Sequence, residues 1–173
     1  SAVKQMGHRM HAESAEAFFR PAADRLALHP DRQAGLSYLY GFLCHFALDS
    51  VCHPYVEAQV KRTKFTHIEL EAEFDRMLMI HDGLNPLSHF PAGHIIPSRK
   101  NAAAIAPFFP SVTPEQVQDT LQSMLTCNRL LLAPRLPKRL LIHAVFALSG
   151  NASSLRGVMI PMHAAPACRG SNR

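Results

Sequence analysis

The sequence contains no tryptophan, only three tyrosines and no run of lysine and arginine. Nucleic-acid-binding proteins stack bases on aromatic side chains and hold phosphates with clustered basic ones, so a specific nucleic-acid partner is not expected. No stretch approaches the roughly 18 consecutive apolar residues of a transmembrane helix. Charged residues are scarce at 18% against 47% hydrophobic residues, which excludes a disordered chain. The net charge of +5 fits an ordinary solvated surface.

Cysteine is also scarce, and no two cysteines form a Cys-x-x-Cys pair. The four are Cys44, Cys52, Cys127 and Cys168. A zinc site made of thiolates is therefore not expected, and we predict free thiols. Free thiols favour a cytoplasmic protein, and residues 1–8 lack the apolar segment of a signal peptide. Because the sequence does not begin with Met, we expect the gene to start further upstream.

Apolar residues recur at helical spacing, and no segment alternates like a β-strand. We predict helices over residues 11–28, 31–50, 67–80, 114–132 and 138–148. Asp31, Thr66 and Thr113 are the predicted caps. Six of the 13 prolines lie between residues 85 and 114, which predicts a Pro-rich loop in the middle of the chain, with a short helix around residues 101–106. The expected fold is all-α, in one domain over residues 1–173.

The helix predicted over residues 31–50 is apolar on wide faces, so we expect it to be buried and to end before His53-Pro54. His45 and Asp49 interrupt it, four residues apart and therefore on one face. A buried, unpaired carboxylate is costly, and a bound divalent cation would compensate that cost. This pair is therefore a candidate for metal binding.

A second pair of the same kind, His67 and Glu71, lies on the next predicted helix, and His53 lies between the two pairs. Neutral imidazole and carboxylate are ligands that suit zinc. A single pair of this spacing is most often a surface salt link. Two pairs and a further histidine favour a metal site between packed helices.

These residues carry a resemblance to a known family. The segment Tyr40–Tyr55, YGFLCHFALDSVCHPY, resembles the central segment of the bacterial zinc-dependent phospholipase C family. Its His-x-x-x-Asp motif and following histidine precede His67-x-x-x-Glu71, which begins fourteen residues after His53. Upstream, Gly7-His8-Arg9-Met10-His11 resembles the family's Gly-x-x-Met-His element. The resemblance is strongest over residues 7–83.

The resemblance implies a compact helical fold, like that of phospholipase C and P1 nuclease, with up to three zinc ions. The implied ligands are His11, His45 and Asp49 for one ion, and His53, His67 and Glu71 for a second. Asp49 would also bridge to a third ion, so we assign it as the catalytic residue. The implied activity is phosphodiester hydrolysis that converts a phospholipid to diacylglycerol and a phosphorylated head group. Such an enzyme would contact the membrane surface transiently.

The sequence also departs from the family. The family has an N-terminal ligand, an early histidine and an aspartate before the element that contains His11, and none of these can be placed here because only ten residues precede His11. We therefore expect a chain truncated at both ends, with weak or no hydrolysis of its own. Two alternatives stay open: a zinc nuclease of the related fold, and a non-catalytic helical module stabilised by metal.

The remaining histidines have ordinary structural interpretations. His81, His89 and His94 flank or lie in the Pro-rich loop, and we predict exposed side chains for all three, with the lining of a cleft as the less favoured alternative. His143 lies on an apolar helix and is predicted to be a core histidine. Phe108-Phe109, between prolines, is expected to pack inside the protein rather than to contact lipid.

Overall fold

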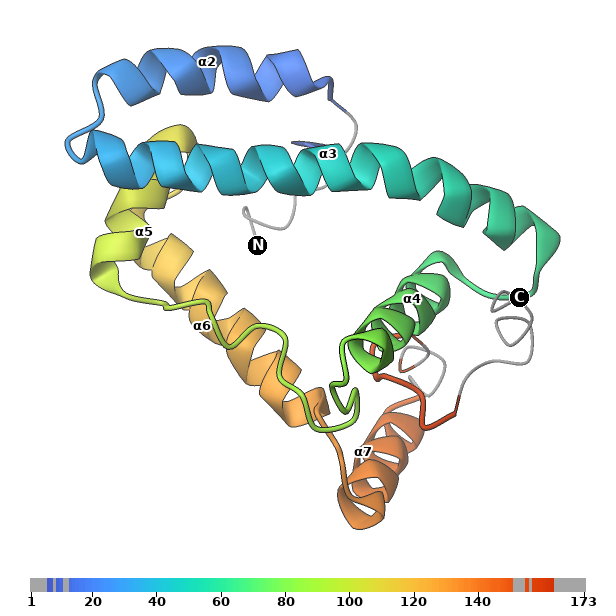
Figure 1. Cartoon of the computed structure of the whole chain (residues 1–173). Helices are drawn as coiled ribbons and strands as arrows, with labels where there is room; N and C mark the ends of the chain where they lie inside the picture. The colour runs from blue at the N-terminus through green and yellow to red at the C-terminus, as the bar shows by residue number, and fades with distance from the viewer. Residues whose placement is uncertain (1–5, 8, 11–12, 151–154, 156, 164–173) are drawn as a thin grey trace. The chain divides into compact units, whose positions relative to one another are not determined.

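A computed structural model describes residues 6–7, 9–10, 13–150, 155 and 157–163 of the chain (Figure 1). These residues form helices and no β-strand. The elements are α2 (Ala15–Ala27), α3 (Arg32–Arg62), α4 (His67–His81), α5 (Arg99–Ile105), the short 3₁₀ helix η1 (Ala106–Phe108), α6 (Pro114–Leu131) and α7 (Leu136–Leu148). The predicted all-α fold class is confirmed.

Two helices begin at capping boxes, and their caps Thr66 and Thr113 are the ones that the sequence predicts. At the start of α4, the Thr66 hydroxyl accepts a hydrogen bond from the Glu69 N–H, and the Glu69 carboxylate accepts one from the Thr66 N–H. Before α6, Thr113 and Gln116 make the equivalent pair of bonds at 2.9 and 3.3 Å. These side chains satisfy N–H groups that the first turn of a helix leaves free.

The helix α3 begins beside its predicted cap, where Asp31 Oδ1 accepts a hydrogen bond from the Ala34 N–H at 3.0 Å. Its predicted end before His53-Pro54 is wrong, because the helix passes through Pro54 and ends at Arg62. A proline inside a helix removes one hydrogen bond and costs about 3 kcal/mol. Tertiary packing outweighs this local preference: Val56, two residues beyond the proline, is only 8% exposed.

The prediction that this helix is buried is also wrong. Several of its large apolar side chains are 60–75% exposed, namely Tyr40, Leu48, Val51 and Tyr55. The less exposed positions lie on one face of the helix, at residues 34, 35, 38, 39, 42 and 49 and again at 52, 53, 56, 59 and 60. Apolar residues lie all round the helix, but packed neighbours cover only one side of it.

The chain divides into two compact units. Unit 1 consists of residues 1–50 and 93–125, and unit 2 consists of residues 51–92 and 126–173. The division falls inside α3 and α6, so each of these helices contributes to both units. The single domain over residues 1–173 stays a prediction.

Unit 1 is held together by aromatic packing. Figure 1 shows α2 lying along the first part of α3, and the ring centroids of Phe18 and Phe42 in these helices are 4.5 Å apart. Phe109 lies 5.7 Å from Phe18. Phe108 is 1% exposed and stacks on Tyr38. Phe108 and Phe109 therefore pack within the protein, as the sequence analysis favoured.

A buried histidine that sequence reasoning missed stabilises the turn between α2 and α3. His29 is 8% exposed, and its Nδ1 accepts a hydrogen bond from the Asp31 N–H at 3.1 Å. Its Nε2 therefore carries the hydrogen and donates to the Ala104 carbonyl at 2.9 Å. The ring stacks on Phe108, and a Cβ on Gly35 would lie 3.1 Å from it. The ring of His29 thus links the turn before α3 to α5.

Replacing His29 with leucine is expected to destabilise the protein by about 2–3 kcal/mol. The Ala104 carbonyl and the Asp31 N–H would lose their partners, and an unsatisfied buried polar group costs about 1–3 kcal/mol. Urea denaturation of His29→Leu would measure the loss. The control is His94→Leu, an exposed histidine in the same unit. Equal midpoints for the two variants would contradict the structural role of His29.

Unit 2 has its own small core. It consists of Ala133, Leu155 and Met159, packed by Leu131, Ile142 and Phe146. Ile142 and Phe146 lie four residues apart and turn one face of α7 to this core. His143 is exposed, so its prediction as a core histidine is wrong. Consecutive residues of a helix point about 100° apart, so Ile142 packs into the core while His143 points away from it.

A glycine lets the segment at residues 157–163 approach the first turn of α4. Gly157 has a φ of +79°, in the left-handed region that favours glycine. A Cβ at this position would lie 2.5 Å from the backbone N of Glu69 and the backbone C of Ile68. No side chain fits there, so this contact depends on glycine. The close contact of Gly157 with Ile68 and Glu69 fixes the first turn of α4, which contains His67.

Candidate metal centre

Two helical segments of unit 2 bring three predicted ligands together. His53 comes from α3, and His67 and Glu71 come from α4. His67 is the first residue of α4, directly after the Thr66 cap, and Glu71 lies one turn further along on the same face. The capping box therefore sets where both α4 side chains point.

The three side chains lie within hydrogen-bonding or near-contact distance. Nε2 of His67 is 2.9 Å from Oε1 of Glu71, and Nε2 of His53 is 3.7 Å from the same oxygen. The two imidazole rings are 4.9 Å apart and nearly perpendicular, so they do not stack. One ligand atom from each residue lies within 4.8 Å of the other two. Their nitrogens and oxygen therefore lie close enough together to bind one ion.

This arrangement fits a zinc ion. Zinc lies about 2.0–2.2 Å from nitrogen and oxygen ligands, so tetrahedral ligands lie roughly 3.4 Å from one another. The observed separations of 2.9 and 3.7 Å bracket that value. The side chains are 35–44% exposed, which leaves one side of the group open. Two histidines and one glutamate with an open position form a ligand set typical of catalytic zinc.

The other predicted ligands belong to unit 1. His45 and Asp49 form an ion pair on α3, with Nε2 and Oδ2 3.3 Å apart. The His45 side chain is 60% exposed and that of Asp49 is 28% exposed, so the argument from a buried carboxylate is wrong. Their role as zinc ligands stays a prediction. His11 lies outside the described residues.

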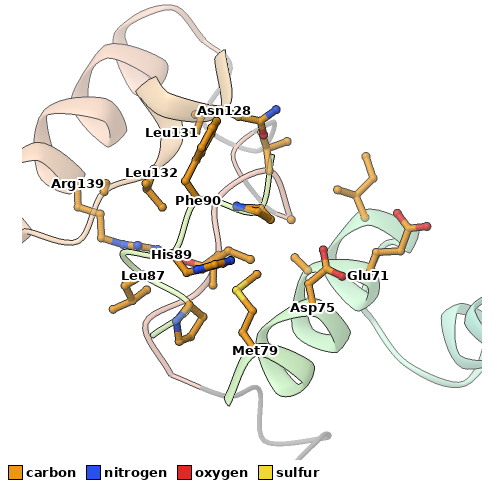
Figure 2. Close-up of a pocket in the computed structure, with 18 residues that line it drawn as sticks. Glu71, Asp75, Met79, Leu87, His89, Phe90, Asn128, Leu131, Leu132 and Arg139 are labelled. Carbon is orange, nitrogen blue, oxygen red and sulfur yellow. Dashed lines mark hydrogen bonds between the residues drawn. The ribbon is translucent and has the colours of Figure 1, made fainter. Parts of the chain in front are cut away.

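A pocket of about 250 Å³ lies beside the three ligands and shares Glu71 with them (Figure 2). On one side, α4 contributes Glu71, Asp75 and Met79. The other walls come from the Pro-rich loop, the end of α6, the start of α7 and residues 157–160. Figure 2 shows Asp75 and Met79 pointing into the pocket, with His89 across from them.

The pocket contains charges of both signs. Burial raises the pKa of Asp75, and the negative charge of Glu71 one turn away raises it further. Arg139 lines the other side, and burial lowers the pKa of its guanidinium. Sequence reasoning missed both residues as pocket residues. The spacing from Glu71 to Asp75 could have indicated the carboxylate, but no local signal marks Arg139.

The three loop histidines have different surroundings. His81, the last residue of α4, and His94 are exposed as predicted. His89 is half-buried and lines the pocket, so its prediction as an exposed side chain is wrong. The loop folds back over the pocket instead of extending into solvent, and the Phe90 ring lies 5.1 Å from the Arg129 guanidinium.

The cysteines that the structure describes are not paired. Cys44, Cys52 and Cys127 are free thiols, as predicted, and Cys168 lies outside the described residues. None of these three belongs to the ligand group, which contains only imidazole and carboxylate.

The fold and the ligand group agree with a comparison against protein-family models. The model of zinc-dependent phospholipase C matches residues 2–109, so this chain belongs to that family. The matched region contains all the ligands predicted from the sequence, whereas Arg139 and the start of α7 lie beyond it. Neither the curated proteins nor the solved structures include a match to this chain.

No helix in the described part of the chain is long and apolar enough to span a membrane. This agrees with the absence of a long apolar run in the sequence.

Proposed function

We propose that this chain is a zinc-dependent phosphodiester hydrolase that releases diacylglycerol and a phosphorylated head group from a phospholipid. The observation that carries the proposal is the convergence of His53, His67 and Glu71 beside a pocket with polar walls. Membership of the zinc-dependent phospholipase C family supports this kind of reaction. Access to the substrate would need transient contact with a membrane surface.

The chain's own residues would hold the ion and leave room for substrate. His53 and His67 would bind it through Nε2 and Glu71 through Oε1. When bound, zinc would polarise a phosphoryl oxygen and lower the pKa of water. The ligands come from two helical segments, so their separation is preorganised and little movement is needed on binding. The exposed side of the group is where a phosphate can approach.

The resemblance extends the proposal to further ions, up to three in all. His11, His45 and Asp49 would hold one of them, and Asp49 would be the catalytic residue. The 3.3 Å separation of His45 and Asp49 supports this part, because it lets both side chains reach one ion.

Zinc-dependent release of phosphorylated head group from phospholipid vesicles is the expected result, at a low rate. The rate is expected to be low because the described residues bring together one group of three possible ligands, whereas efficient phosphodiester hydrolysis uses several ions in fixed geometry. The assay compares phospholipid vesicles with single-stranded DNA, each with zinc and after chelation. Glu71→Gln is the inactive control, because an amide binds zinc poorly.

The other outcomes of this assay distinguish the two alternative functions, a zinc nuclease and a non-catalytic module. Zinc-dependent cleavage of DNA without lipid hydrolysis would support a nuclease. Bound zinc with neither activity would support a non-catalytic module stabilised by metal.

A further inference from the structure

Among the residues that the structure describes, Arg139 has no acidic partner in the pocket. It lies in the first turns of α7, and its side chain reaches the pocket wall opposite α4 (Figure 2). Among the described residues, its recorded hydrogen bond runs from Nη2 to the Ile160 carbonyl at 2.6 Å, and it forms no ion pair. A guanidinium has five N–H donors, so one carbonyl leaves most of them available.

The surroundings of Arg139 favour an anionic ligand. A half-buried charge loses hydration, and an ion of opposite sign compensates that loss. The lowered pKa of Arg139 has the same cause, burial. The planar guanidinium suits a carboxylate or a phosphate, because either can accept two parallel hydrogen bonds from it. With the phosphate placed at His53, His67 and Glu71, a carboxylate is the anion left for Arg139.

The opposite wall carries negative charge. Glu71 and Asp75 lie four residues apart on α4, so their Cβ atoms are about 5–6 Å apart. Figure 2 shows Asp75 directed into the pocket, whereas Glu71 belongs to the ligand group. A molecule with its phosphate at the metal group and a two-carbon chain attached would bring its next polar group near Asp75.

We propose that this pocket binds a head group that carries both an ammonium and a carboxylate, as phosphoserine does. Asp75 would bind the ammonium, and Arg139 would bind the carboxylate. The inference rests on the proposed function, which places the phosphate at His53, His67 and Glu71. A choline head group has no carboxylate and would leave Arg139 unpaired.

Two soluble ligands test the role of Arg139, because O-phosphoserine and O-phosphoethanolamine differ by one carboxylate. Calorimetric titration of the zinc-loaded chain is expected to show about tenfold tighter binding of phosphoserine, the usual effect of one charged hydrogen-bonded contact. In Arg139→Gln the ratio of the two affinities, phosphoserine over phosphoethanolamine, is expected to fall to about one. The affinity for phosphoethanolamine itself should change little. A wild-type ratio near one, or a ratio that persists in the variant, would overturn the inference.

A matched control separates a local contact from a general effect of charge. Arg135→Gln removes the same charge from an exposed residue just before α7 that does not line the pocket. It is expected to keep the wild-type ratio. If Arg139→Gln does not fold, Arg139→Lys is the test variant. Lysine keeps the positive charge but lacks the planar guanidinium, so the ratio of the two affinities should fall about threefold. An unchanged ratio in Arg139→Lys would then overturn the assignment.

The role of Asp75 is tested with phosphoethanolamine and glycerol 3-phosphate, which lacks the ammonium. Asp75→Asn is expected to weaken phosphoethanolamine several-fold relative to glycerol 3-phosphate. Asp82→Asn, an exposed residue just after α4, is the control. If Asp75→Asn binds phosphoethanolamine as tightly as wild type does, Asp75 does not bind the ammonium.

Hydrolysis of phosphatidylserine vesicles is measured separately, so that the two proposals can fail independently. Selective binding that depends on Arg139, without any lipid hydrolysis, would contradict the proposed function and support the pocket's specificity. Lipid hydrolysis with no effect of Arg139→Gln on head-group preference would contradict the inference and leave the proposed function standing.

Discussion

Zinc affinity at the candidate centre is expected to fall more than about a hundredfold when His67 is replaced by alanine. Loss of a residue that only supports a metal ligand costs about 10–100-fold, and His67 is itself one of the three ligands. Because bound metal also stabilises the folded state, zinc should raise the unfolding temperature of wild type but not that of the variant. Zinc titration followed by thermal unfolding measures both effects.

The control for this experiment is His81→Ala. His81 is the last residue of the same helix, is exposed and lies outside the ligand group. Alanine suits a helix at either position, so α4 should form in both variants. Equal zinc affinity in His67→Ala and His81→Ala would contradict the assignment of the centre.

Replacing Gly157 with alanine is expected to reduce the free energy of unfolding by roughly 2–5 kcal/mol. The left-handed φ of +79° contributes about 1–2 kcal/mol for a residue with a Cβ. Overpacking contributes about 1–3 kcal/mol more, because the Cβ would lie 2.5 Å from backbone atoms of Ile68 and Glu69. Those atoms cannot rotate away, so the first turn of α4 must shift. Zinc affinity should therefore fall as well, since His67 belongs to that turn.

The variant Gly83→Ala separates the two contributions. Gly83 also has a positive φ, +73°, but nothing lies within 4 Å of a Cβ built on it. It should lose only the conformational contribution of about 1–2 kcal/mol and keep its zinc affinity. Urea denaturation and zinc titration of both variants measure the difference. Equal losses in the two variants would show that the contact of Gly157 with α4 has no energetic importance.

Local signals in the sequence predict most of the helices and the three residues of the candidate metal centre. Thr66 and Thr113 begin α4 and α6 as predicted, because capping depends on residues three positions apart. His67 and Glu71 face one way for a similar reason, since residues four apart share a helix face. Such relationships need only the chain's own backbone geometry and can be read without any tertiary contact.

Predictions of burial were less successful. The apolar residues of α3 suggested a buried helix, and His143 suggested a core position, yet both predictions were wrong. Local apolar content shows that a segment can be buried but not which side its neighbours cover. The same limit explains why α3 passes through Pro54, where a local rule predicts an end.

The sequence by itself determined the all-α class, the starts of α3, α4 and α6, the family, and the three candidate ligands that lie together in unit 2. Only the tertiary structure showed that His29 is buried, that Gly157 lies against α4, and that Arg139 shares a pocket with Asp75. Asp75 and Arg139 are 64 positions apart, and no periodicity relates them. Their juxtaposition results from the packing of α4, α6, α7 and the Pro-rich loop, which follows from long-range contacts rather than from local backbone geometry.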